Sequence, residues 1–232
     1  YFDPRLGTEY SNEKIEQVLK KFHANYKYLE DSELIKETAN LLSEKKVIGW
    51  FQDKMEFGPR ALGSRSIIAD PRDQFMQKKI NMKIKYREGF RPFAPMVLED
   101  YVKNFFDLET ISPYMLLVGQ VKGYQEYKGN LDKFIGFEKL KNIKSSIPAV
   151  THVNYSARIQ TVSQNQNKKI YSLIQEFYKI TNIPILVNTS FNIKDEPIVE
   201  SPEDAFRCFM GSGLDYLVCG NFLLKKDEQY ND

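Results

Sequence analysis

Apolar side chains in the first fifty residues recur at helical spacing and then switch to a strand pattern. Ile15, Val18, Leu19 and Phe22 are spaced three or four apart between Lys and Glu residues, which predicts an amphipathic helix that begins near Ser11. A second helix is expected from residue 31 or 32 to residue 42, followed by a strand over residues 47–51. The chain therefore begins with helices and continues into a sheet.

Further along, short apolar runs alternate with helical stretches. Strands are expected over residues 67–69, 94–98, 115–121, 149–153, 158–162, 183–187 and 216–224, and helices over 74–83 and 169–178. Alternation of this kind predicts an α/β fold with a twisted mixed sheet and flanking helices. Residues 123–146, rich in Lys, Gly and Asn, indicate an irregular insertion.

The best-defined helix follows Glu200. Ser201 is a good N-cap, Pro202 suits the first helical position, and two carboxylates follow in the first turn. Gly211 or Gly213 is expected to end the helix.

Composition indicates a globular protein with a local basic excess. The 232 residues are 42% hydrophobic and 28% charged, which suits one large domain. The net charge is only +2, although residues 60–91 carry nine Lys or Arg against three Asp or Glu. The small total argues against a nucleic-acid-binding protein, because such proteins usually concentrate a large positive excess.

Two cysteines, with spacing that fits neither a disulfide scaffold nor a zinc site, suggest a reducing cytoplasm. No apolar run is long enough to span a membrane, and no signal pattern opens the chain. The start at Tyr1 rather than Met leads us to expect a longer parent protein. We expect a linker and N-terminal helix over residues 1–30 and a domain over residues 31–232.

The first candidate segment for chemistry is residues 55–66, MEFGPRALGSRS. Gly58-Pro59 predicts a tight turn that places Arg60 beyond the end of a strand, where α/β sheets bind ligands. The guanidinium suits a phosphate or carboxylate ligand. The alternative is an exposed arginine paired with Glu56 or Asp70.

The second segment, residues 81–95, contains several cations. Lys83, Lys85 and Arg87 alternate, so in an extended chain they would project to one face, and Arg91 precedes a proline that favours extended geometry. The apolar residues nearby would hold these cations against the core. The alternative is an ordinary solvated basic face.

Two more segments could contribute to the same site. His152 is more often structural than catalytic when no second His or Cys lies near it, and Arg158 could enter the same cleft as Arg60. Asn188 and Ser190 end a buried strand, where polar side chains fit a binding site or cap the strand as turns.

Neither standard Gly-rich phosphate loop occurs, so a nucleotide here would be held by cations and polar strand ends. A Ser-His-Asp nucleophile set is not apparent either. These absences favour chemistry in which the protein positions anionic reactants and neutralises their charge.

Together these motifs resemble the C-terminal region of the NodU/CmcH/TobZ-type O-carbamoyltransferase family. The resemblance rests on residues 49–52 (GWFQ), 55–63, 66–72, 90–97, 188–192 (NTSFN), 196–199 (EPIV) and 201–205. It implies a YrdC-like domain with a basic ligand cleft, which forms carbamoyl adenylate from ATP, with Mg²⁺, and carbamoyl phosphate. It also implies an N-terminal transferase domain, with its own metal site and absent from this chain, as a partner that passes the carbamoyl group to a hydroxyl.

Carried over by position, the resemblance assigns binding of ATP and carbamoyl phosphate to six residues, the first three of them also catalytic: Arg60, Lys85, Arg91, Arg158, Asn188 and Ser190. Lys85, Arg91 and Arg158 are expected to neutralise phosphates, and Arg60 to orient the carbamoyl donor. No metal is expected to be bound by the chain itself.

One departure from the family pattern lies after His152. Asn154-Tyr155-Ser156 stands where the family usually has Asp-Gly-Ser or Asp-Gly-Thr. We expect the lost carboxylate to weaken a magnesium or hydroxyl contact, and Tyr155 to crowd the ligand.

Two other functions fit the sequence less well. A non-catalytic ATP-binding or docking module would bind the nucleotide without releasing pyrophosphate. An RNA-binding surface along residues 60–91 would show affinity that falls steeply with salt.

Overall fold

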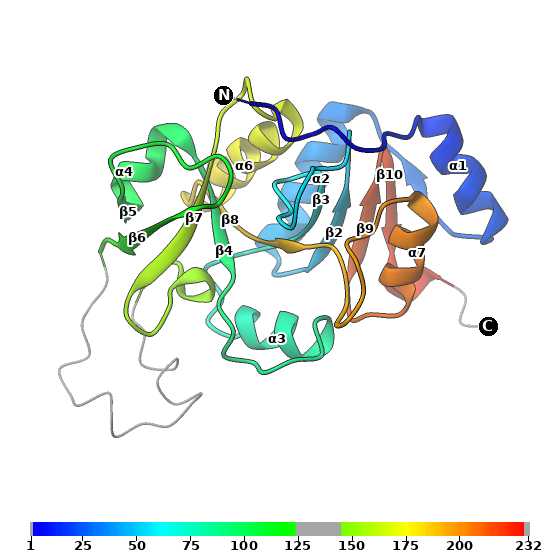
Figure 1. The fold of residues 1–232 in the computed structure, drawn as a ribbon. Coiled ribbons are helices and arrows are strands. Elements are labelled where there is room, and N and C mark those ends of the chain that lie inside the picture. The colour runs from blue at the N-terminus through cyan, green and yellow to red at the C-terminus, as the bar shows by residue number, and fades with distance from the viewer. Residues whose placement is uncertain (1, 124–144, 230–232) are drawn as a thin grey trace.

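A mixed β-sheet forms the centre of the computed structural model, which describes residues 2–123 and 145–229. Ten strands of the described chain pair in the order β1-β10-β9-β2-β3-β8-β4-β7-β6-β5 (Figure 1). Their bounds are β1 Lys27–Tyr28, β2 Ile48–Phe51, β3 Arg65–Ala69, β4 Ala94–Leu98, β5 Phe106–Asp107, β6 Leu117–Val121, β7 Ser156–Val162, β8 Ile185–Ser190, β9 Tyr216–Cys219 and β10 Phe222–Lys225.

The sheet contains two parallel pairings, β2 with β9 and β4 with β7, and the other neighbours are antiparallel. Every residue of β2, β3 and β4 is buried, as expected for strands covered on both faces. The expected α/β class with a mixed sheet is confirmed.

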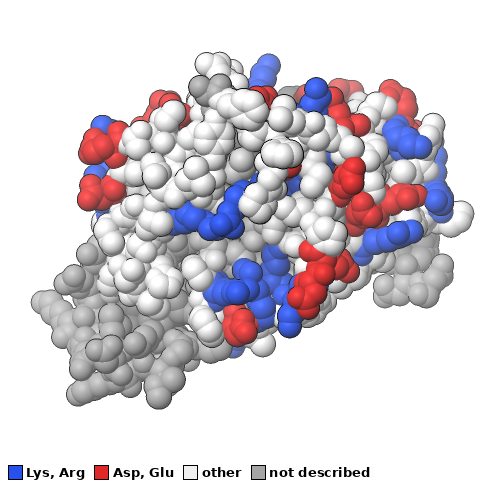
Figure 2. Space-filling view, in the orientation of Figure 1, with Lys and Arg blue, Asp and Glu red and all other residues white. Residues whose placement is uncertain are grey.

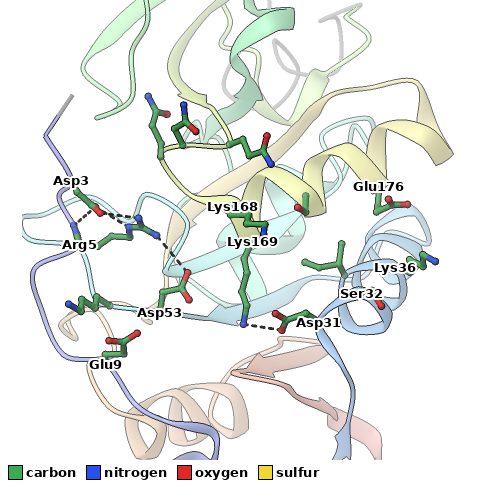
Figure 3. Close-up of a pocket in the computed structure, with 16 residues that line it drawn as sticks. Asp3, Arg5, Glu9, Asp31, Ser32, Lys36, Asp53, Lys168, Lys169 and Glu176 are labelled. Carbon is green, nitrogen blue, oxygen red and sulfur yellow. Dashed lines mark hydrogen bonds and ion pairs between the residues drawn. The ribbon is translucent and has the colours of Figure 1, made fainter.

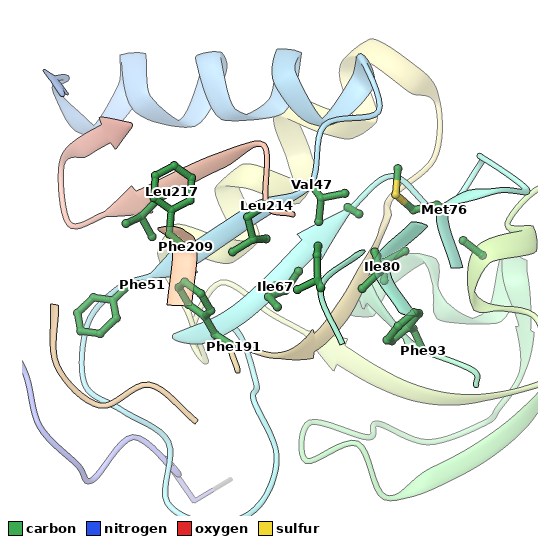
Figure 4. Packing of buried hydrophobic residues seen from close by; sticks show 14 of the residues in the cluster. Val47, Phe51, Ile67, Met76, Ile80, Phe93, Phe191, Phe209, Leu214 and Leu217 are labelled. Atoms are coloured by element: carbon green, nitrogen blue, oxygen red, sulfur yellow. The ribbon is translucent and has the colours of Figure 1, made fainter. Parts of the chain in front are cut away.

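Helices cover both faces of this sheet. The helices are α1 Asn12–Lys21, α2 Asp31–Ser43, α3 Met76–Lys83, α4 Val102–Phe105, α6 Lys168–Thr181 and α7 Pro202–Met210. Apolar residues of α2 and α6 share one core with Ile48, Trp50 and Ile68. Residues of α1, α3 and α7 share the other core with Val47 and Ile67 (Figure 4). No helix among the described residues is long and apolar enough to cross a membrane.

The N-terminal helix packs against the body of the protein. Ile15 and Leu19 of α1 belong to the second of these cores, and the ring of Phe22 stacks on that of Phe206 in α7 with centroids 4.9 Å apart. A domain boundary at residue 30 stays a prediction, but α1 contributes to the same core as the sheet.

The helix after Glu200 forms as its local signals predict. Ser201 Oγ accepts a hydrogen bond from the Asp204 amide at 3.1 Å, and Asp204 Oδ2 accepts one from the Ser201 amide at 3.0 Å. This capping box satisfies two amide groups at the helix start, and Gly211 ends the helix.

Two expected strands differ from the structure. The strand expected over residues 216–224 is a hairpin of β9 and β10, in which Gly220 turns the chain with a φ of 55°. The strand expected over residues 149–153 does not form. Residues 149–153 do not pair in the sheet, and Pro148–Val150 instead form a short 3₁₀ turn. Thr151 Oγ1 donates to the carbonyl of Ile147 at 2.8 Å, which closes the turn, and the Ala149 amide donates to the carbonyl of Pro71. A local side-chain hydrogen bond and a proline therefore outweigh the apolar pattern here. Of the expected insertion, residues 124–144 lie outside the described residues.

Candidate functional site

A polar cleft of about 630 Å³ opens where five segments of the chain meet. They are the loop before β3, the loop between α3 and β4, the start of β6, the start of β7 with its preceding turn, and the end of β8. The lining residues include Pro59, Arg60, Ala61, Arg87, Arg91, Phe93, Met115, Val118, His152, Asn154, Ser156, Arg158, Asn188, Thr189 and Ser190. Figure 2 shows Lys and Arg side chains gathered near the middle of one face, with acidic side chains beside them.

Four arginines line this cleft, and none of its described lining residues is an Asp or Glu. Burial lowers the pKa of the Arg158 guanidinium, and the positive charge of Arg60 lowers it further. Burial and the charge of Arg91 lower the pKa of Arg87, while the charge of Glu88 acts in the opposite direction. Neighbouring cations in a cleft without a lining carboxylate favour an anionic ligand.

The loop that carries Arg60 is held by a buried carboxylate. Glu56, 5% exposed, accepts hydrogen bonds from the amides of Leu62 and Ser64, each at 2.7 Å, and from the amide of Arg65. Asp70 instead binds the guanidinium of Arg72 at 2.6 Å. Within the described residues Arg60 has no ion pair with either acid, so its guanidinium is available to a ligand.

Helix α3 holds the opposite wall of the cleft. The amide groups of Gln77 and Asn81 each donate to the carbonyl of Arg91 at 2.9 Å. Asn81 Oδ1 accepts a hydrogen bond from Arg87 Nε at 2.7 Å. Two buried amides thus fix the loop that carries Arg87 and Arg91.

The expected alternation of Lys83, Lys85 and Arg87 on an extended chain is wrong. Helix α3 continues through Lys83, and Tyr86 turns the chain with a φ of 45°. Lys83 is exposed, Lys85 is buried and Arg87 lines the cleft. Period-two spacing therefore does not place these cations on one face.

Lys85 lies behind the cleft wall rather than among its lining residues. Its ammonium donates to the carbonyls of Ser190 and Asn192 at 2.6 and 2.9 Å and to Asn192 Oδ1 at 2.6 Å. Ser190 Oγ lies 3.3 Å away. Burial lowers the pKa of Lys85 to about 7, and the charge of Arg87 adds to this effect. Lys85 thereby joins the loop after α3 to the end of β8.

The end of β8 is also anchored by an aromatic ring. Phe191, between Ser190 and Asn192, is fully buried in the core (Figure 4). Its ring packs on Gly49 of β2, where an added Cβ atom would lie only 2.6 Å from Phe191 Cζ. The absence of a side chain at Gly49 is therefore needed for this packing.

Asn188 is 1% exposed and forms part of the cleft wall. Its Nδ2 donates to the carbonyl of Ala61 at 2.8 Å and to Gln160 Oε1 at 2.7 Å. Its Oδ1 and the Nε of Arg158 are buried without a hydrogen-bond partner. Other buried atoms without a partner, such as Ser64 Oγ, belong to residues outside the cleft lining, whereas Asn188 and Arg158 both line the cleft, which favours a ligand as the missing partner.

Tyr155, in the turn before β7, does not crowd the cleft as its departure from the family pattern led us to expect. Tyr155 is 8% exposed, adopts a φ of 60° and does not line the cleft, so its ring does not crowd a ligand there. Asn154 Oδ1 accepts hydrogen bonds from the amide and hydroxyl of Ser156 at 3.2 and 2.7 Å. It also lies 2.8 Å from His152 Nδ1. Asn154 therefore shapes the turn that carries His152.

The described residues do not offer a metal site. No group of three or more His, Cys, Asp or Glu is arranged to hold an ion within them, and no carboxylate lines the cleft among them. Mg²⁺ prefers oxygen ligands, chiefly carboxylates, phosphates and water. These residues fit the phosphates of a nucleotide better than the metal ion itself.

A larger hollow of about 810 Å³ lies between the N-terminal segment and the starts of α2 and α6 (Figure 3). Its charges compensate one another: Lys169 Nζ lies 3.3 Å from Asp31, and Arg5 lies 3.8 Å from Asp53. It therefore lacks the unbalanced charge of the cleft.

The structure brings five of the six expected residues into one cleft, with Lys85 behind it. The sequence interpretation did not single out three residues of this region as site residues: Arg87 lines the cleft, and Gln160 and Asn192 bind its wall. The position of Arg87 in a run of cations over residues 83–91 was an available signal. No local signal marks Gln160, whose partner is in another strand.

Fold and cleft together define an α/β protein with a mixed sheet and an arginine-lined cleft. Residues 39–226 match the family described as Carbamoyltransferase C-terminus. The chain belongs to this family.

Relatives from distant organisms match nearly all of the chain. Protein sll1178 of Synechocystis is 50% identical over 97% of this chain, nodulation protein NolNO of Sinorhizobium fredii is 41% identical over 97%, and protein MJ1051 of Methanocaldococcus jannaschii is 36% identical over 95%. The chain spans 37, 31 and 40% of the length of these relatives.

Among solved structures, full-length HypF in a phosphate- and nucleotide-bound form shares the fold. The TM-score is 0.52 at 18% identity, over 89% of this chain and 23% of the HypF chain. The expected YrdC-like arrangement, a mixed sheet with flanking helices, is confirmed.

Proposed function

We propose that this domain binds ATP and carbamoyl phosphate in the arginine-lined cleft and forms carbamoyl adenylate. The observation that carries the proposal is the convergence of Arg60, Arg87, Arg91 and Arg158 without a lining carboxylate among the described residues. Membership of the carbamoyltransferase family supports a carbamoyl donor. The phosphate and nucleotide in the HypF structure, which shares the fold, support an ATP-binding role.

The arginines suit the charge of these substrates. Each charge-assisted hydrogen bond contributes about 1.5–3 kcal/mol, so several together would hold a triphosphate. Arg91 and Arg158 would neutralise phosphates, with Arg87 beside them, and Arg60 would orient the carbamoyl donor. Lys85 would act from behind the wall by fixing the position of Ser190.

Atom balance sets the proposed stoichiometry: ATP, carbamoyl phosphate and one water give carbamoyl adenylate, phosphate and pyrophosphate. Water would first cleave carbamoyl phosphate between the bridging oxygen and phosphorus, which gives carbamate and phosphate. A carbamate oxygen would then form a bond to the α-phosphorus of ATP, and the bond from that phosphorus to the pyrophosphate group would break. Negative charge builds up on the phosphate oxygens in this step, and preorganised guanidinium groups stabilise it. Mg²⁺ would enter with the nucleotide, which supplies the oxygen ligands that the cleft lacks.

The carbamoyl adenylate would pass to an acceptor hydroxyl in a partner transferase domain. The relatives are two and a half to three times as long as this chain, which leaves room for such a domain in them.

The test is calorimetric titration of the chain with ATP and Mg²⁺, with and without carbamoyl phosphate, while pyrophosphate release is followed. Micromolar binding with donor-dependent release supports the proposal. Binding without release supports a docking module that uses the same cleft. Absence of binding to both substrates contradicts the assignment of the cleft.

A further inference from the structure

Two buried amide side chains meet at the wall of the cleft. Asn188 of β8 and Gln160 of β7 lie on either side of β4 in the sheet, and they are 1% and 3% exposed. Asn188 Nδ2 donates to Gln160 Oε1 at 2.7 Å, across 28 residues of sequence. Their contact therefore depends on the sheet order.

Backbone carbonyls fix the orientation of both amides. Gln160 Nε2 donates to the carbonyl of Leu62 at 2.8 Å, and Asn188 Nδ2 also donates to the carbonyl of Ala61 at 2.8 Å. A carbonyl oxygen can only accept, so each amide must turn its NH₂ group towards the loop before β3. Because Gln160 Nε2 points to Leu62, its Oε1 faces Asn188 and can only accept. Asn188 must therefore direct Nδ2 towards both Gln160 and Ala61.

This orientation leaves Asn188 Oδ1 as an acceptor without a donor. In the same wall, Arg158 Nε is a buried donor without an acceptor. A ligand group that carries both an N–H and a carbonyl oxygen offers a donor to the first atom and an acceptor to the second. A carbamoyl group, H₂N–C=O, has this pair, whereas an acetyl group has only the carbonyl oxygen.

We infer that Gln160 is a positioning residue that presents Asn188 Oδ1 to the NH₂ group of the carbamoyl donor, so that the cleft selects carbamoyl phosphate over acyl phosphates. This inference rests on the proposed function. Selection arises because an acetyl donor would leave Asn188 Oδ1 unpaired. An unpaired buried acceptor costs more binding free energy than an unpaired acceptor exposed to water. Gln160 itself need not touch the ligand.

The first measurement compares the dissociation constants of the chain for carbamoyl phosphate and acetyl phosphate, which differ by NH₂ in place of CH₃. We expect carbamoyl phosphate to bind at least about tenfold more tightly. If neither compound binds, the proposed function fails. If both bind equally, the proposed function stands and the inference about Asn188 is overturned.

The variant Gln160→Met keeps the length of the side chain and removes its hydrogen bonds. It should reduce the preference for carbamoyl phosphate, measured as the ratio of the two dissociation constants, to within about twofold of unity. The matched control is Gln229→Met, because Gln229 is also buried and its amide donates to backbone carbonyls, those of Asn25 and Lys225, away from the cleft. A preference unchanged in Gln160→Met would overturn the positioning role.

The variant Gln160→Glu gives a second readout if Gln160→Met fails to fold. A protonated carboxyl can donate to the Leu62 carbonyl and accept from Asn188, as the amide does, whereas a carboxylate cannot donate. The preference for carbamoyl phosphate should therefore recover as pH falls through the pKa of the new acid. The preference of the unaltered chain, measured over the same range, is the reference. A pH profile parallel to this reference would overturn the inference.

Discussion

Lys85 Nζ lies 2.6 Å from Oδ1 of Asn192, more than a hundred residues further along the chain. This contact fastens the loop after α3 to the end of β8, and so joins two walls of the cleft. Lys85 thereby links stability of the fold to geometry of the site.

We predict that Lys85 makes the stability of the protein depend on pH. Burial lowers its pKa from 10.5 to about 7 in the folded chain, so between these values the unfolded chain binds more protons. The free energy of unfolding contributed by Lys85 therefore rises as pH increases from 7 to 10.5. Urea unfolding of the unaltered chain and of Lys85→Met should show a gap that widens with pH. A constant gap for Lys85→Met would contradict the prediction.

Loss of one cation from the cleft should weaken nucleotide binding. Arg91→Ala and Lys85→Ala are each expected to reduce ATP affinity at least about tenfold, the first by removing a charge from the cleft and the second by releasing Ser190. Arg207→Ala removes an exposed arginine of α7 outside this cleft and should change the affinity less than about twofold. Calorimetric titration measures all three, and unchanged affinity in both cleft variants would count against the site.

A methyl group at Gly49 should displace the ring of Phe191 and so disturb the end of β8 in the cleft wall. In Gly49→Ala the new Cβ would lie 2.6 Å from the ring of Phe191, so the ring must move or the strands must part. Overpacking of this kind costs about 1–3 kcal/mol of unfolding free energy. Because Phe191 stands between Ser190 and Asn192, ATP affinity should fall as well. Gly211→Ala is a useful comparison, since its φ of −81° suits alanine and the one neighbour of an added Cβ, the carbonyl oxygen of Arg207, lies 3.3 Å away. Intact ATP affinity in a destabilised Gly49→Ala chain would show that the ring does not position the β8 end.

Removal of the capping box should affect stability alone. Ser201→Ala loses the hydrogen bond to the Asp204 amide and is expected to lower the free energy of unfolding by about 1 kcal/mol. Ser201→Thr can keep that bond and should lose less. Denaturant unfolding gives the difference, and ATP affinity should stay constant because α7 does not line the cleft.

Local sequence signals predicted the elements that depend on local physics. Ser201, Pro202 and Gly211 mark α7 without reference to the rest of the chain, and the strand expected over residues 94–98 coincides with β4. The strand expected over residues 149–153 was wrong because an apolar run does not reveal the side-chain hydrogen bond that closes a turn.

Residue types and the family resemblance predicted which side chains form the site, but not all of the contacts between them. Arg60 and Arg158 were expected in one cleft, and the structure confirms that placement. The burial of Lys85 and the contact between Asn188 and Gln160 were not predicted, since their partners come from distant segments. Such contacts depend on strand order, which no local pattern in this chain specifies.

The sheet ends on both sides in very short strands. In the described part of the chain, β1 and β5 each contribute two residues at the two edges. Unpaired strand edges attract further strands from other molecules, and very short edges offer few free amide and carbonyl groups for such pairing. The sheet thereby resists self-association along its edges without closing into a barrel, which leaves the faces of the molecule to determine what it binds.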